Sequence, residues 1–495
     1  MIRIEKYKFK KMKKNLFLFS FIFTIFYIPH SLASQEKDPE PRYVSKIVTN
    51  EDGKTYLEVE GKPFLYNSVQ SWFPPGADYE IYMQKTAEVN YKVFCFWLLW
   101  AQLEPEEGKY DWSSIDRVID LANKYDLRLD IVWGGSSFCG GMDPRFLPQW
   151  LMERDDLKVK NEYGQIALSR KGDMGLQPHM DYTNPEVYEI EKKMVVALMN
   201  HIYEYDKNNR VIFFQVENEV NLPRRMGNWE WSKLYDKKLV LDYCDKIGKL
   251  VKDSPYKIAT RINFAGKFLT DEAYDLEHID CQGPDIYTDD IEVVRKFIKQ
   301  NKGFAHIAEN AAYGNSSSLI TAALAAGGFY NIYRLDYDHV WNKPGVWGDN
   351  WIYLKQNGAV TYDVLLLNAG MNKISRLIAE SPPEAFLEFN TEKSYPEWNY
   401  DRVKQFNGIN FGFMNTENAG EGEPVGFVLA NGDDFYLIAD KNVLFTFDKK
   451  PDVCETGRLN EEGRWEKSHE KKCRITGEGN YRVHYDYFDC IKVSF

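Results

Sequence analysis

The sequence predicts an α/β chain in which a (β/α)8 barrel is followed by a C-terminal all-β sandwich. From about residue 55 to residue 377, short apolar runs alternate with helical patterns, as in repeated βα units around a parallel sheet. After Ser381-Pro382-Pro383 the pattern changes to alternating strands, and Asn431-Gly432 between two of them indicates a hairpin. A chain of 495 residues with 44% hydrophobic content can bury both cores.

The barrel prediction depends on eight apolar runs, each followed by a loop and usually by a helical pattern. In residues 115–125, for example, Ile115, Val118, Ile119 and Ala122 fall on one side of a helix. Eight such units close into a barrel of the TIM type, and the long loop over 134–184 is predicted to line its cleft. The expected barrel strands are 64–69, 92–97, 128–133, 211–216, 257–262, 279–287, 304–308 and 328–335, and the sandwich strands are 425–430, 435–439, 443–447 and 491–495.

The N-terminus is typical of an export signal. Basic residues such as Arg3 and Lys10 precede an apolar run over 16–28, and Ser31-Leu32-Ala33 supplies small residues at cleavage spacing. We therefore expect a signal peptide over 1–33 and a periplasmic or extracellular protein. The expected parts that follow are a lead-in linker over 34–54, the barrel over 55–380 and the sandwich over 383–495.

Net charge and aromatic content indicate which kinds of molecule the protein can bind. The first 33 residues hold seven basic groups and one acidic group, so removing them takes the formal net charge from −12 to −18. Such an acidic chain is a poor candidate for binding nucleic acid or an anionic membrane, and a neutral substrate suits it better. The 15% aromatic content fits either large cores or platforms that stack on sugar rings.

The cysteines and histidines show no metal-ligand spacing. Cys95 and Cys281 lie in apolar runs and are expected to be buried free thiols, whereas Cys454 and Cys473 flank a polar stretch and could form a disulfide. His306 is expected to be a satisfied histidine of the barrel interior. Neither His179 nor His339 has a partner at ligand spacing, so no metal or cofactor is predicted.

Two apolar strands end in glutamates. Residues 211–219 end in Glu217-Asn218-Glu219, and residues 303–310 end in Glu309-Asn310, at the fourth and seventh strands of the eight. Either glutamate alone could be an ordinary solvated carboxylate, but charges at the tips of buried strands are costly unless they face a polar cleft. Retaining glycoside hydrolysis needs two carboxyl groups about 5–5.5 Å apart, one as acid/base and one as nucleophile.

Several motifs carry a family resemblance over most of the barrel. The stretch 215–219, QVENE, resembles a motif of family 35 glycoside hydrolases, and 100–112, with EPEEG-x-YDW, resembles a stretch shared by families 35 and 42. Pro148-Gln149-Trp150-Leu151 and Asp285-Ile286-Tyr287 are also similar to segments of these families. The resemblance implies a retaining glycosidase, with β-galactosidase the leading activity and an oligo- or polysaccharide as substrate.

The same resemblance assigns roles. It implies Glu219 as acid/base, Glu309 as nucleophile, Asn218 as a ligand of the sugar 2-hydroxyl and Tyr287 as a hydrogen-bond donor to the nucleophile. Residues two apart on a strand share a face, so Glu217 enters the cleft with Glu219 if the strand continues. By residue pattern alone, the choice between these two glutamates stays open.

Some assignments keep two alternatives. Glu104 either touches substrate or fixes its own loop. Trp133 and Trp347 are candidate sugar platforms, as are Trp341 and Trp351, with core packing as the alternative for all four. The stretch 136–142 keeps a cysteine of the family 35 pattern and lacks its glutamate, so another sugar, an endo mode of action, or a non-catalytic glycan-binding protein on this scaffold also remain open.

Overall fold

The structure is a computed structural model of the 495-residue chain. It describes residues 39–495 apart from 72–78, 139–140, 171–175, 222–236, 268, 312–313, 334, 337–351, 354–358, 390–402, 416–423, 470–472 and 487–488. The predicted signal peptide lies outside the described residues, and so do His339 and the three candidate tryptophans Trp341, Trp347 and Trp351. All that follows concerns the compact unit Pro41–Phe495.

Eight parallel strands form the central sheet, in the order in which they occur in the chain. The last strand pairs with the first, and a parallel bridge between Asp285 and Glu309 joins the sixth to the seventh, which closes the ring. This arrangement confirms the predicted (β/α)8 barrel. Its strands one to eight are β5 (Asn67–Ser71), β6 (Val93–Leu98), β7 (Arg128–Phe138), β10 (Val211–Asn218), β12 (Ala259–Phe264), β13 (Cys281–Pro284), β14 (His306–Asn310) and β15 (Phe329–Tyr333).

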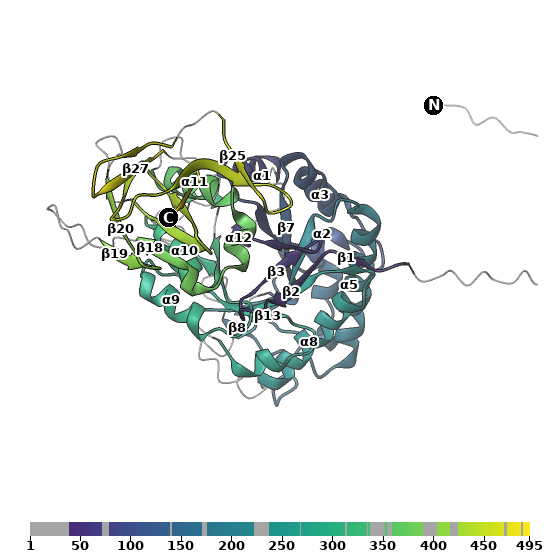
Figure 1. The fold of residues 1–495 in the computed structure, drawn as a ribbon. Coiled ribbons are helices and arrows are strands. Elements are labelled where there is room, and N and C mark those ends of the chain that lie inside the picture. The colour runs from purple at the N-terminus through teal and green to yellow at the C-terminus, as the bar shows by residue number, and fades with distance from the viewer. Residues whose placement is uncertain are drawn as a thin grey trace, which may run out of the picture. The chain divides into compact units, whose positions relative to one another are not determined.

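Helices α3, α5, α8 and α9 follow one another around the outside of the barrel sheet (Figure 1). The predicted apolar side of α3 is buried, from Ile115 to Ala122. Helix α5 begins at Pro185 after the cap Asn184, whose side chain accepts a bond from the Glu186 N–H. The helices are α1 (Tyr79–Glu88), α2 (Trp100–Leu103), α3 (Ser113–Tyr125), α4 (Gln149–Met152), α5 (Pro185–Tyr205), α8 (Lys237–Asp253), α9 (Ile291–Gln300), α10 (Ser316–Ala325), α11 (Ala359–Asn372) and α12 (Ser375–Glu380), with 3-10 turns at Asp155–Leu157, Asp271–Asp275 and Pro383–Ala385.

Short strands precede the barrel, in and after the stretch expected to be a linker. Strand β1 (Arg42–Tyr43) pairs with β11 (Tyr256–Lys257), while β2 (Ser45–Thr49), β3 (Thr55–Val59) and β4 (Lys62–Phe64) form an antiparallel sheet. The apolar run from residue 64 to 69 spans both the end of β4 and the start of β5, so periodicity alone did not separate them. The remaining two-residue strands pair as β8 (Ser169–Arg170) with β9 (Leu176–Gln177) and β16 (Leu335–Asp336) with β17 (Ile352–Tyr353).

The chain beyond the barrel forms two antiparallel sheets that share one apolar core, as predicted for a sandwich. The Asn431-Gly432 hairpin is confirmed, since Asn431 pairs with Asp434 and Gly432 has φ +61°. One sheet contains β18 (Phe386–Phe389), β21 (Gly426–Asn431), β22 (Asp434–Ala439), β28 (Ile491–Ser494), β24 (Val453–Leu459) and β25 (Trp465–Lys467), and the other β19 (Lys404–Phe406), β20 (Ile409–Asn415), β23 (Val443–Phe447), β27 (Tyr481–Tyr485) and β26 (Ile475–Thr476).

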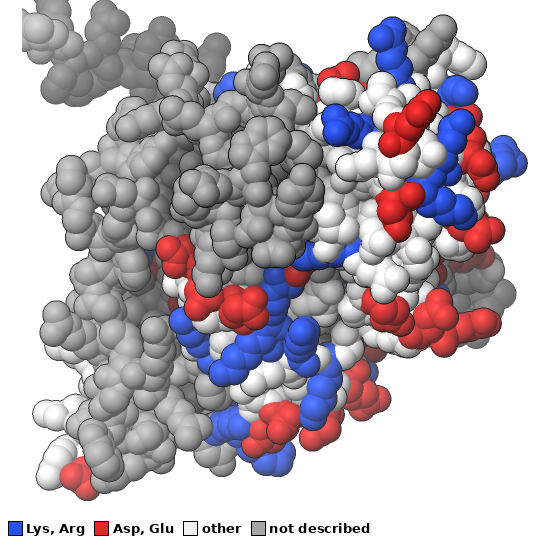
Figure 2. Space-filling view, turned by 60° about the vertical axis from the view of Figure 1, so that its left-hand side comes forward, with Lys and Arg blue, Asp and Glu red and all other residues white. Residues whose placement is uncertain are grey.

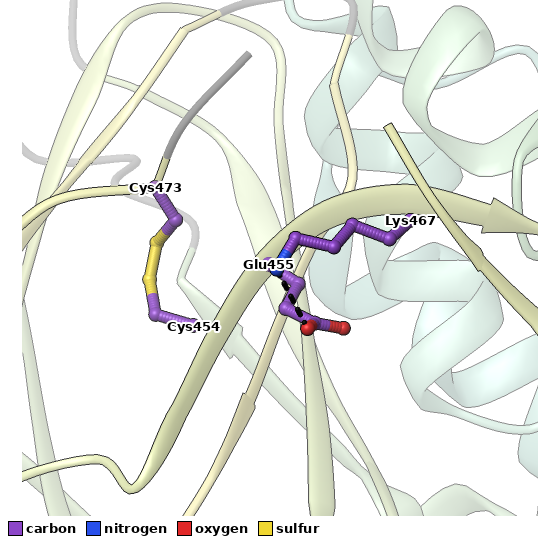
Figure 3. The surroundings of a disulfide bond; sticks show 4 residues. All are labelled: Cys454, Glu455, Lys467 and Cys473. Atoms are coloured by element: carbon purple, nitrogen blue, oxygen red, sulfur yellow. Dashed lines mark hydrogen bonds and ion pairs between the residues drawn. A yellow bond between two sulfur atoms is a disulfide. The ribbon is translucent and has the colours of Figure 1, made fainter. Parts of the chain in front are cut away.

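The structure contains the disulfide and the two free thiols expected of the cysteines. Cys454 on β24 forms a disulfide with Cys473, with 5.6 Å between their Cα atoms, beside an ion pair of Glu455 and Lys467 (Figure 3). Cys95 and Cys281 are buried free thiols, as predicted. The bridge links β24 of one sheet to the residue two positions before β26, which belongs to the other sheet.

Charge on the described surface is mixed. On the face shown in Figure 2, lysines and arginines lie among aspartates and glutamates. Among the helices that the structure describes, none is both long enough and apolar enough to cross a bilayer.

Candidate active site

Three carboxyl groups lie at the carboxyl ends of three barrel strands. Glu309 lies on β14, Asp285 follows β13, and Glu219 directly follows β10. The charge of Glu219 raises the pKa of both other carboxyls, Asp285 and Glu309. The backbones of Asp285 and Glu309 are joined directly, because the Ile286 N–H donates to the Glu309 carbonyl at 3.0 Å. These are strands four, six and seven of the barrel.

Two donors hold the Glu309 carboxylate. Gln70 Nε2 lies 2.6 Å from one oxygen and the Tyr287 hydroxyl 2.7 Å from the other. The Gln70 amide cannot turn over without loss, because its oxygen accepts bonds from Asn331 Nδ2 and from the Cys95 thiol. Burial and the Glu219 charge raise the pKa of Glu309 to about 7, and the two donors oppose this rise. The donors therefore identify Glu309 as a carboxylate aimed and stabilised in its charged form.

Tyr287 is held by its backbone in an unusual conformation. Its φ is +43°, a left-handed value that a bulky residue rarely adopts. Asn310 holds the next residue in place, because it accepts from the Thr288 N–H and donates to the Thr288 carbonyl, each at 2.8 Å. The residue is 44% exposed, yet burial of its hydroxyl and the charge of Glu309 raise the pKa of Tyr287 well above its usual value. The hydroxyl therefore keeps its proton and remains a donor.

A bulge at the end of β10 separates Glu217 from Glu219. The pairing with β7 shifts register between Val216 and Asn218, and the two glutamates have φ values of +56° and +48°. Glu217 is fully buried, accepts from Ser136 Oγ at 3.3 Å and lies with Glu191 against Gly135. The strand thus continues past Glu217, where two steps along β10, from Val216 to Asn218, face five along β7, from Trp133 to Phe138. The left-handed backbone at both glutamates breaks the alternation that would have placed them on one face.

An amide network fixes the tip of β10. Asn218 is buried, and its side-chain oxygen accepts from Gln215 Nε2 at 2.9 Å and Asn263 Nδ2 at 3.0 Å. Asn263 on β12 also accepts from the Glu219 N–H at 2.9 Å and donates to Asp285 at 3.0 Å. One amide therefore contacts the Asn218 side chain, the Glu219 backbone and the Asp285 carboxyl.

A buried ion pair lies deeper in the barrel. Arg261 Nε is 3.0 Å from Asp130, both side chains are fully buried, and the Tyr66 hydroxyl also donates to Asp130. The Arg261 guanidinium also contacts the Cys95 thiol and lowers the pKa of Glu309. This positive charge therefore partly offsets the effect of burial on the Glu309 carboxylate.

Two predicted substrate ligands, Trp133 and Glu104, are buried and hydrogen-bonded to neighbouring protein groups. Trp133 is fully buried against Trp100, and its indole nitrogen donates to Glu191 at 2.8 Å. Both carboxylate oxygens of Glu104 are taken, one by the indole of Trp100 and one by the Gly108 N–H, each at 2.7 Å. These contacts agree with the core-packing and loop-fixing alternatives, and the substrate-binding roles of the two residues stay predictions. The third predicted ligand, Trp347, lies outside the described residues.

The structure adds Gln70, Asn263 and Asp285 to the residues predicted from sequence. Each is a polar residue on, or directly after, a buried barrel strand, and a polar residue at such a position is the signal that could have identified them. The catalytic and binding roles assigned to Glu219, Glu309, Asn218 and Tyr287 stay predictions.

In the described part of the chain, no group of three His, Cys, Asp or Glu side chains could hold a metal ion. His306 lies inside the barrel, as expected. Neither ring nitrogen has a side-chain hydrogen-bond partner among the described residues, so the expectation of a satisfied histidine stays a prediction. Burial lowers its pKa to about 3, which keeps the ring neutral. His179 is buried as well.

Comparison with known proteins gives matches over the first part of the barrel. The family model described as Glyco_hydro_42, beta-galactosidase, matches residues 70–232. Beta-galactosidase BbgII of Bifidobacterium bifidum is 29% identical over 161 residues, 32% of this chain and 21% of that protein. Beta-galactosidase BgaA of Clostridium cellulovorans is 27% identical over 124 residues, 25% of this chain and 16% of that protein. The chain thus covers about a fifth of the length of these curated relatives.

Among solved structures, the beta-galactosidase from Bacillus circulans sp. alkalophilus is similar at 14% sequence identity and a TM-score of 0.48. The match covers 66% of this chain and 58% of that one. The family match includes β10 and Glu219 and ends before Glu309.

Proposed function

We propose that this chain, which carries a glycoside hydrolase family 42 beta-galactosidase domain over residues 70–232, is a retaining β-glycosidase with Glu309 as nucleophile and Glu219 as acid/base. One observation carries the proposal: two carboxyl groups from strands four and seven meet where a barrel places its chemistry, and only one of them is held by two donors. Asymmetric surroundings of this kind divide two carboxyls between the two roles.

The chemistry follows from the contacts. The Glu309 carboxylate attacks the anomeric carbon while Glu219 passes its proton to the departing glycosidic oxygen, which leaves a glycosyl ester on Glu309 and an ionised Glu219. Glu219 then takes a proton from water, the water oxygen attacks the same carbon, and the Glu309 carboxylate is released. Gln70 and Tyr287 stabilise that carboxylate before the attack and as it departs.

Asn218 is proposed to contact the sugar 2-hydroxyl. The bonds that its oxygen accepts from Gln215 and Asn263 fix which end of the amide carries the donors. A donor set rigidly beside the anomeric centre can strengthen its bond in the oxocarbenium-like transition state.

A β-galactoside is the proposed substrate. The support is the description of the matching family and the names of the relatives, which are beta-galactosidases. The stretch 136–142 lacks the glutamate of the family 35 pattern, so β-glycosides of other sugars are tested beside the galactoside.

Export is proposed from the sequence. A basic segment followed by the apolar run over 16–28 supports a cleaved signal, and an acidic mature chain suits a neutral glycan outside the cell. The mass of the protein recovered from the culture medium or periplasm, compared with that of the full chain, tests this point.

The function is tested by release of nitrophenol from a panel of nitrophenyl β-glycosides, with wild type beside Glu309→Ala. Release from the galactoside by wild type and none by the variant is the expected result. Azide added to Glu309→Ala should give a glycosyl azide of inverted configuration, while Glu219→Ala should keep activity on dinitrophenyl glycosides, which need no proton. Release from another glycoside would change the sugar and keep the mechanism. No release from any, with glycan binding retained, would indicate a binding protein instead.

A further inference from the structure

The described residues include one buried carboxyl group that the proposed mechanism does not use. Asp285 follows β13, its side chain is fully buried, and it lies next to both reacting glutamates. We propose that Asp285 is a positioning residue: as a neutral carboxylic acid it donates a hydrogen bond to the Glu219 carboxyl and holds that group in place for proton transfer. This inference rests on the proposed function and deepens it.

The Asp285 carboxyl has few hydrogen-bond donors. Asp285 Oδ2 accepts one bond, from Asn263 Nδ2 at 3.0 Å. Asp285 Oδ1 accepts no bond from any described residue. A buried carboxylate with a single neutral donor would be poorly compensated. Glu309, with two donors, and Asp130, paired with Arg261, have partners on their carboxyl groups that Asp285 lacks.

The charges around Asp285 also favour its neutral form. The groups that face it are Glu309 from β14, Glu219 from the end of β10 and the Asn263 amide from β12, and none of them is a cation. Burial first, and then the charges of Glu309 and Glu219, raise the pKa of Asp285 well above its usual value. A neutral Asp285 would have a proton to donate from the carboxyl oxygen that accepts no bond, Oδ1.

The Asn263 amide is shared between Asp285 and Glu219. Asn263 donates to Asp285 and accepts from the Glu219 N–H at 2.9 Å, so the backbone and the side chain of Glu219 are both fixed to the same pair of residues. Glu219 has φ +48°, an unfavourable value that these contacts help to maintain.

This arrangement serves both steps of the reaction without any change at Asp285. When Glu219 is the acid, the bond from Asp285 falls on its carbonyl oxygen and leaves the other oxygen with the proton to transfer. When Glu219 is the base, the same bond supports its carboxylate. No bond to Asp285 forms or breaks, and its proton stays with it.

The test compares Asp285→Asn, a neutral isostere that keeps a donor, with Asp285→Ala. Asp280→Asn, at the opposite end of β13 and paired with Lys252, is the matched control. Because general acid catalysis typically contributes about 10²–10⁴-fold, we expect Asp285→Ala to lose at least about 10-fold in kcat/KM on phenyl β-galactoside. The same variant should lose much less on the dinitrophenyl galactoside, and Asp285→Asn should restore most of the loss. Equal losses on both substrates, or an asparagine variant as damaged as the alanine variant, would overturn the proposal.

A second readout does not depend on activity. Asp285 is neutral when folded and ionises above about pH 4 when unfolded, so the wild type loses stability relative to Asp285→Asn as the pH rises from about 4. The difference in Tm, variant minus wild type, should therefore increase between pH 4 and pH 8. A difference that stays flat or falls would show that Asp285 is charged in the native protein. An inactive wild type with the expected Tm trend would reject the proposed function and leave the neutral acid in place.

Discussion

The hydroxyl of Tyr287 should matter most when the sugar leaves the enzyme. It donates to Glu309 at 2.7 Å, and Tyr287→Phe removes this bond while leaving Gln70 as the other donor. As the glycosyl ester breaks, negative charge returns to Glu309, and the bond re-forms to an ionised group. Hydrogen bonds to charged groups are worth about 1.5–3 kcal/mol, so the loss in kcat should be about 10- to 100-fold when release of the sugar limits turnover.

The assay follows from that reasoning. A dinitrophenyl galactoside makes the first step fast, so kcat for it reports release of the sugar, and a burst of dinitrophenol should precede the slow turnover of Tyr287→Phe. The pH profile gives a second readout. Protonation of Glu309, whose pKa is about 7, should lower wild-type kcat/KM below about pH 7. Because the Tyr287 bond lowers that pKa, its removal should move the acid limb to higher pH.

A remote tyrosine supplies the control. Tyr485 in the sandwich is also buried and donates to the Asp489 carbonyl at 2.7 Å, so Tyr485→Phe reports the cost of losing a buried hydroxyl far from the site. We expect Tyr485→Phe to change Tm and leave both kinetic readouts unchanged. The reasoning fails if Tyr287→Phe keeps wild-type kcat on the dinitrophenyl substrate and an unmoved acid limb.

The remaining predictions concern the bulge, the disulfide and the buried ion pair. Glu217→Gln should keep kcat/KM within about threefold while Glu219→Gln loses about 10²–10⁴-fold on poor leaving groups, and the reverse order in a phenyl galactoside assay would refute the assignment. Replacing Cys454 and Cys473 together by serine should cost about 3 kcal/mol in urea unfolding, given the 19-residue separation; an unchanged midpoint would contradict this. Asp130→Ala leaves a fully buried guanidinium unpaired and should cost about 3–5 kcal/mol in the same assay; a loss below 1 kcal/mol would show that the charge finds another partner.

Much of the barrel could be predicted because its strands are unbroken apolar runs. Runs such as 211–216 and 304–308 are buried along their length in the structure, so their composition alone indicated buried parallel strands. The boundary near residue 64 was harder, because one apolar run serves two different sheets.

The candidate site was predictable in its glutamates and not in its supports. Glu219 and Glu309 end buried strands and match a family pattern, whereas the bulge at Glu217 depends on pairing with β7, which no local pattern encodes. Gln70 reaches Glu309 across 239 residues of sequence, so only the folded ring of strands brings the two together. Trp133 shows the converse, since an aromatic residue near a strand end can face the helices as readily as the cleft.

The most direct test of the central claim is to trap the glycosyl-enzyme ester. Wild type is incubated with a dinitrophenyl 2-deoxy-2-fluoro-β-galactoside, which forms the ester quickly and releases it slowly, and the labelled peptide is sequenced by mass spectrometry. The account predicts one sugar per chain, attached to Glu309, and no label on Glu309→Ala. A label on Glu219, Glu217 or Asp285 would contradict the assignment of the nucleophile.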